Sequence, residues 1–200
     1  MDNYDAAILF NRVPIMPTKL LMAYMYKTEG LLPDQAERVI HSLAREEVIA
    51  FVDNKKYVAR RRAATFTERD RINALVFAVV CHFLPDSAGF TMTPTGINAH
   101  FTYQPKNTKD GTEALPYLVQ LIYVPNGHED VVSAQLLTEP VFEDAPDVIR
   151  RIAIMENPEN HEKMRFVGIR DFAYVDPETY KVKVFARRPK SEAWEDIFDV

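Results

Sequence analysis

The cationic residues in the first part of the chain follow a spacing that could support chemistry. Arg38, Ser42 and Arg45 recur at intervals of four and three residues, so they would share one face of a helix. Lys55 and Lys56 follow in a short polar stretch. Guanidinium, ammonium and hydroxyl groups are donors that contact phosphates and base edges. The spacing therefore indicates a phosphate-binding surface, and a solvated helix face is the alternative.

These cations need elements that hold them in place. Ala36, Val39, Ile40 and Leu43 recur at helical spacing, which predicts a helix over 34–45 with an apolar face opposite the arginines. Further helices are predicted over 2–12 and 18–26, with a stop at Gly30, and strands over 48–52 and 56–60 around a turn at 53–55.

Three helices followed by a two-stranded hairpin resemble the winged helix-turn-helix family, and the resemblance covers a first domain at 1–64. It implies that the third helix enters the major groove of double-stranded DNA beside the hairpin, or wing. The DNA-binding residues it implies are Arg38, Ser42, Arg45, Lys55, Lys56, Arg60, Arg61 and Arg62. Glu37, Glu46 and Glu47 would repel phosphate, so a protein-binding role stays open as the alternative.

The remainder, 65–200, is predicted to be an α/β domain with a central mixed sheet, which makes the whole chain α+β or α/β. A capped helix is expected from Thr67 to Leu84. The segment 130–137 fits a helix or a strand, and its acidic start favours a helix. A short helix is expected over 158–164, and strands over 89–93, 97–104, 117–124, 151–155, 166–175 and 181–186.

A helix, three strands, a helix and further strands resemble the restriction-endonuclease-like core. A winged helix followed by such a core resembles the replication-relaxation family, which acts in plasmid replication or DNA transfer. An active nuclease of this fold needs an Asp/Glu-x-Lys motif on a strand to hold Mg²⁺ and orient water. No Asp or Glu after Thr65 has a Lys two positions on, and the strand 117–123 carries no charge. The resemblance therefore implies a core without catalysis, with a nuclease using a displaced site as the remoter alternative.

Other reactive residues lack partners in the sequence. Cys81 and His82 are adjacent, so on a helix their side chains would point about 100° apart and could not form a dyad. The clusters His128-Glu129-Asp130 and His161-Glu162 have no identifiable further ligand. We expect neither a metal ion nor a cofactor.

Four aromatic residues lie on the predicted strands, namely Phe101, Tyr103, Tyr117 and Tyr123. They could stack on bases, although aromatic residues on strands more often fill a core.

Composition limits the cellular setting and the partners. The apolar run 74–84 is shorter than the ~20 residues of a membrane span. A single cysteine excludes an internal disulfide framework and favours a reducing, cytoplasmic compartment. Lys and Arg outnumber Asp and Glu by ten to eight up to Ala64, whereas acidic residues prevail by 21 to 14 afterwards. We therefore expect a DNA-binding first domain and an acidic second domain that forms a homodimer or binds a protein partner.

Overall fold

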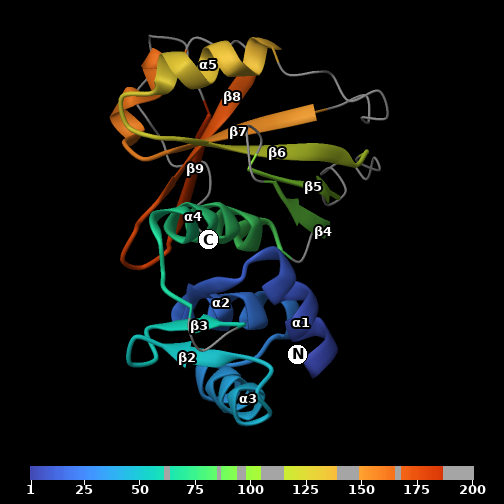
Figure 1. Cartoon of the computed structure of the whole chain (residues 1–200). Helices are drawn as coiled ribbons and strands as arrows, with labels where there is room; N and C mark the ends of the chain where they lie inside the picture. The colour runs from blue at the N-terminus through green and yellow to red at the C-terminus, as the bar shows by residue number, and fades with distance from the viewer. Residues whose placement is uncertain are drawn as a thin grey trace. The chain divides into compact units, whose positions relative to one another are not determined.

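The computed structural model describes residues 1–60, 64–84, 87–93, 98–104, 115–138, 149–164 and 168–186 (Figure 1). The chain divides into two compact units, Met1–Pro85 and Asp86–Val200. The sequence predicts a domain boundary between residues 64 and 65. In the structure the first unit also includes the following helix, because that helix packs against elements of the N-terminal part.

Three helices begin the first unit: α1 (Asn3–Arg12), α2 (Thr18–Glu29) and α3 (Pro33–Arg45). The side chain of Asp2 caps α1 by accepting hydrogen bonds from the backbone N–H groups of Tyr4 and Asp5. Gly30 ends α2 in the left-handed conformation, with φ 68°, as its residue type predicts. The predicted positions of all three helices are confirmed to within a few residues.

A three-stranded antiparallel sheet completes the small N-terminal fold. Its strands are β1 (Ile15–Pro17), β2 (Ala50–Val52) and β3 (Tyr57–Ala59), in the order β1-β3-β2. The β2–β3 hairpin was expected, but β1 was not. All three residues of β1 are buried, so this short strand joins the sheet to the core of the first unit.

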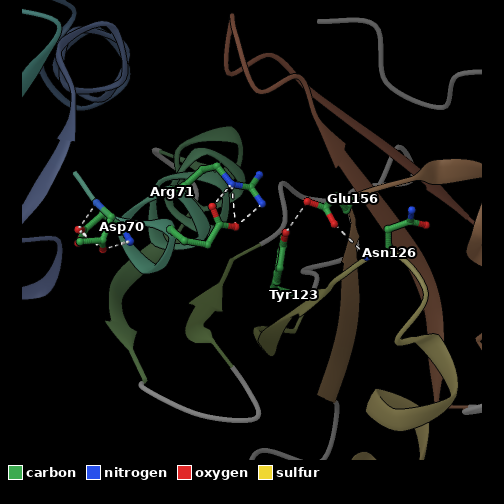
Figure 2. A network of polar contacts seen from close by, with 7 residues as sticks. Asp70, Arg71, Tyr123, Asn126 and Glu156 are labelled. Atoms are coloured by element: carbon green, nitrogen blue, oxygen red, sulfur yellow. Dashed lines mark hydrogen bonds and ion pairs between the residues drawn. The ribbon is translucent and has the colours of Figure 1, made fainter.

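Helix α4 (Glu68–Phe83) also belongs to the first unit, and it packs against α2 and β1. A capping box opens it, because the Thr67 hydroxyl accepts from the Asp70 N–H at 3.3 Å and the Asp70 carboxylate accepts from the Thr67 N–H at 2.9 Å (Figure 2). Eight consecutive residues, from Ala74 to Cys81, are buried. This burial agrees with the apolar sequence of the helix from Ala74 onward.

The second unit is built on a mixed six-stranded sheet whose order follows the chain, β4-β5-β6-β7-β8-β9. Its strands β6, β7 and β8 are parallel to one another, and the other neighbours are antiparallel. The strands are β4 (Ser87–Met92), β5 (Ala99–Tyr103), β6 (Tyr117–Val124), β7 (Ile149–Met155), β8 (Ile169–Val175) and β9 (Val182–Ala186). The expected mixed sheet is therefore present.

Two helical segments connect the parallel strands on the same face of the sheet. Helix α5 (Glu129–Thr138) joins β6 to β7, and the 3₁₀ helix η1 (Pro158–Lys163) precedes β8 (Figure 1). Val132 and Leu136 of α5 and Met164 after η1 share one apolar cluster with β6, β7 and β8. The segment that fitted either a helix or a strand is thus helical.

A polar network fixes the turn between β6 and α5. The Glu156 carboxylate accepts from the Tyr123 hydroxyl at 3.1 Å and from the Asn126 N–H at 2.9 Å (Figure 2). The Asn160 side-chain amide donates to Asn126 Oδ1 at 2.6 Å. These hydrogen bonds tie the turn to Glu156, which follows β7, and to Asn160 of η1.

Candidate nucleic-acid interface

Helix α3 presents its two arginines to solvent. Arg38 and Arg45 are exposed, whereas Ile40 and Leu43 on the opposite face are buried, at 1% and 3% exposure. Val39, which was expected in the core, is only half-buried. Arg38 Nε donates to the Asp34 carbonyl at 3.2 Å, so its side chain lies back along the first turn of the helix. The predicted pair of exposed cations on one helix face is present.

Ser42, the third predicted residue of this face, already has an acidic partner. Its hydroxyl donates to Glu46 Oε1 at 3.0 Å, and Asn3 Nδ2 donates to Glu46 Oε2 at 2.7 Å. These hydrogen bonds, that from Asn3 foremost, lower the pKa of Glu46 and keep it ionised. Ser42 therefore lies beside a fixed negative charge, which makes it a poor phosphate contact.

The hairpin turn carries the next two cations, and three of its residues have a left-handed backbone. Asp53, Asn54 and Lys55 have φ values of 48°, 49° and 69°. Thr18, the first residue of α2, donates its hydroxyl to the Lys55 carbonyl at 2.6 Å and its N–H to the Lys56 carbonyl at 3.0 Å. The turn is thus anchored to the start of α2, and the side chains of Lys55 and Lys56 are exposed.

An aromatic residue connects this turn to α3. The Phe51 ring lies 5.0 Å from the ring of His41 on α3, measured between centroids. Lys55 Nζ lies 5.5 Å from the centroid of the same Phe51 ring, within range of a cation–π contact. Phe51 therefore brings the turn and the exposed face of α3 together. No sequence pattern indicates this role of Phe51, because His41 lies ten residues away in the chain on another element.

Lys56 makes a separate aromatic contact. Its Nζ lies 5.2 Å from the centroid of the Tyr57 ring, and Tyr57 stacks on Phe66 at 4.1 Å. The contact with Tyr57 raises the pKa of Lys56, so this side chain stays protonated at neutral pH.

Of the three arginines that follow β3, the structure describes only Arg60. Arg60 lies at the opposite end of β3 from the turn, where its guanidinium donates to the Asn11 side chain of α1 and its N–H to the Pro14 carbonyl at 3.0 Å. This predicted contact residue thus serves the packing of α1. Arg61 and Arg62 lie outside the described residues.

The charge around the interface is balanced. Among the described residues, α3, the hairpin and the residues directly after them carry five cations and five acidic residues: Arg38, Arg45, Lys55, Lys56 and Arg60 against Asp34, Glu37, Glu46, Glu47 and Asp53. Glu37 lies 3.9 Å from His41 Nε2. The cations that remain available for phosphate are Arg38, Arg45, Lys55 and Lys56.

The polar residues on the strands of the second unit bear on nuclease chemistry. Gln120, in the middle of β6, is 1% exposed, and its side-chain carbonyl accepts from Arg151 Nε at 3.0 Å. Asp171 on β8 pairs with Arg150 at 2.7 Å. Among the described residues, no group of three or more His, Cys, Asp and Glu side chains could hold a metal ion.

The remaining reactive residues have structural surroundings. Cys81 is buried, and burial raises the pKa of its thiol. His82 follows it on α4, and burial lowers the pKa of its imidazole. His161 is 8% exposed and contacts the rings of Phe172 and Phe185 at centroid distances of 5.6 and 6.1 Å.

Comparison with known proteins adds no relative: no protein-family model and no curated protein matches the chain. Among the described helices, none combines the length and the apolar character that crossing a membrane requires.

Proposed function

We propose that the N-terminal unit binds double-stranded DNA as a winged helix, with α3 in the major groove and the β2–β3 turn on the backbone. The observation that carries this proposal is the link through Phe51, which places Lys55 beside the exposed face of α3. A helix and a hairpin acting together contact base edges and phosphates at once.

In this proposal the second unit has no catalytic role, and it mediates dimerisation or contact with a protein partner. One recognition helix supplies few contacts, so a dimer would supply two half-sites. The proposed resemblance to the replication-relaxation family rests on the element order α4-β4-β5-β6-α5-β7 along the chain. Of these elements, α4 belongs to the first unit and the others to the second. This resemblance favours a role in the replication or transfer of a plasmid or another mobile element.

The proposal is tested by titrating a labelled duplex of mixed sequence with the full chain at two salt concentrations. The double substitution of Lys55 and Lys56 by Ala should weaken binding to all sequences and flatten the salt dependence by roughly one unit per lost phosphate contact. Arg38→Ala or Arg45→Ala should weaken the binding free energy by ~1–3 kcal/mol where the arginine donates hydrogen bonds to a guanine.

A matched control removes the same charge elsewhere. Lys181 and Lys183 are exposed residues of the second unit, and replacing both with Ala should leave duplex binding unchanged. Absence of binding at low salt, or equal losses in both double variants, would contradict the DNA interface.

A protein-binding adaptor is the second candidate, and a specific observation favours it. The first unit exposes three large apolar or aromatic side chains, Tyr4 at 73%, Tyr26 at 55% and Leu32 at 59%. Together with the balanced charge around α3, they would suit a protein surface better than a phosphate backbone. A failed duplex titration combined with self-association in solution would support this second function.

A further inference from the structure

A row of polar and aromatic side chains crosses four adjacent strands near one end of the six-stranded sheet. Tyr103 on β5 lies directly opposite Tyr117 on β6. Val119 on β6 is the register partner of Arg150 on β7, so these two side chains lie on the same face. Tyr117 precedes Val119 by two residues and therefore shares that face with Arg150. Asp171 on β8 pairs with Ile152, which places it on this face too.

Contacts between these side chains hold the row in a defined arrangement. The rings of Tyr103 and Tyr117 lie 5.3 Å apart at an angle of 51°. Arg150 Nη1 donates to the Tyr117 hydroxyl at 3.0 Å, and Arg150 Nε donates to Asp171 Oδ2 at 2.7 Å. Burial alone would lower the pKa of Arg150, but the hydrogen bond and charge of Asp171 raise it. The guanidinium is therefore permanently charged and held on two sides.

The two tyrosines differ from the other aromatic residues of these strands. Phe101 and Tyr123 are 2% and 7% exposed and fill the core. Tyr103 and Tyr117 are only half-buried, and the Arg150 side chain keeps 30% of its exposure. Among the described residues, Arg150 Nη2 has no hydrogen-bond partner. The row thus consists of two half-buried tyrosine rings beside an oriented cation.

We propose that Tyr103, Tyr117 and Arg150 form a binding surface for single-stranded nucleic acid, on which unpaired bases stack on the tyrosine rings and Arg150 Nη2 donates to a phosphate. Base stacking on aromatic side chains is tolerant of sequence and requires bases that are not already stacked in a duplex. Because Asp171 neutralises part of the charge of Arg150, stacking supplies most of the affinity. This surface is separate from the proposed duplex interface on the first unit.

The test is a titration of a labelled oligothymidylate with the full chain, followed by fluorescence anisotropy. Tyr103→Leu and Tyr117→Leu should each weaken binding about tenfold, because each removes one stacking ring. Arg150→Gln should weaken binding and reduce the salt slope by about 0.7, the value expected for one phosphate contact on a single strand.

The control is Tyr174→Leu, which changes a half-buried tyrosine on the other face of β8. Tyr174→Leu should leave oligothymidylate binding unchanged. Thermal melting of each variant verifies that the variant folds. Equal losses in Tyr174→Leu and the row variants would indicate a structural effect and overturn the proposal. Absence of binding by the unchanged protein at low salt would overturn it as well.

A last variant separates the two proposals. Replacing Lys55 and Lys56 with Ala should leave oligothymidylate binding intact, even where it abolishes duplex binding. Loss of single-strand binding in that variant would place the single strand on the first unit and refute the tyrosine surface. Failure of duplex binding with retained oligothymidylate binding would refute only the winged-helix interface.

Discussion

Cys81 is a sensitive reporter of opening, because its thiol is buried on α4 and burial raises its pKa. Only the thiolate reacts rapidly with disulfide reagents, so the folded protein should react far more slowly at pH 8 than an unfolded chain. The measurement is the rate of thiol modification by an aromatic disulfide, with and without denaturant.

The reference is the same protein unfolded in denaturant. Its Cys81 thiol should be modified at the rate of a free cysteine. Because burial raises the pKa of Cys81 above this range, raising the pH from 7 to 9 should raise the native rate about tenfold per pH unit, whereas the reference rate should level off near the ordinary cysteine pKa. Rapid native modification that follows the thiolate fraction of an ordinary cysteine would show that Cys81 is accessible.

Single residues also show where prediction from the sequence reaches its limit. The exposure of Arg38 and Arg45 follows from helical spacing and is present. Phe51 on β2 contacts His41 on α3 and Lys55 in the hairpin turn. These contacts depend on tertiary packing, so no local sequence pattern predicts them. The pairing of Ser42 with Glu46 was foreseeable, since residues four apart on a helix are neighbours.

The capping box of α4 gives a prediction about a whole element. Thr67→Ala removes the hydroxyl that accepts from the Asp70 N–H, so it should lower the free energy of unfolding by about 1 kcal/mol. Urea denaturation followed by circular dichroism measures the change.

Thr67→Ser retains the hydroxyl and should leave the unfolding midpoint nearly unchanged. An equal loss in the Ser and Ala variants would mean that the methyl group of Thr67, and not the cap, carries the stabilisation.

Elements with a long periodic pattern were predictable, whereas short or featureless ones were not. Helix α3 and strand β6 lie where their patterns place them. Strand β1 spans only Ile15–Pro17, directly after Pro14, and it is too short for any periodicity to appear. From Ala74 onward helix α4 is apolar on nearly every side, so its sequence does not indicate which unit it packs against.

At the scale of the whole molecule, the proposed absence of catalysis is directly testable. The purified full chain with Mg²⁺ or Mn²⁺ should leave supercoiled plasmid intact, because the strands of the second unit bear no carboxylate-x-Lys motif. Agarose electrophoresis over time measures nicking and linearisation.

A known metal-dependent nuclease in the same buffer verifies that the assay detects cleavage. Cleavage that co-purifies with the protein through several columns and is lost on chelation of the metal would demonstrate a displaced active site. Substitution of carboxylates in the second unit would then locate it.

The parallel strands β6, β7 and β8 follow one another in the sheet and are connected on a single face, where α5 and Met164 pack. Right-handed crossovers that advance in one direction always place their connections on the same side. Evolution and protein engineering can therefore lengthen, shorten or label these connections without touching the face that carries Tyr103, Tyr117 and Arg150. A fluorophore attached near η1 would report on this unit from the side away from the proposed ligand.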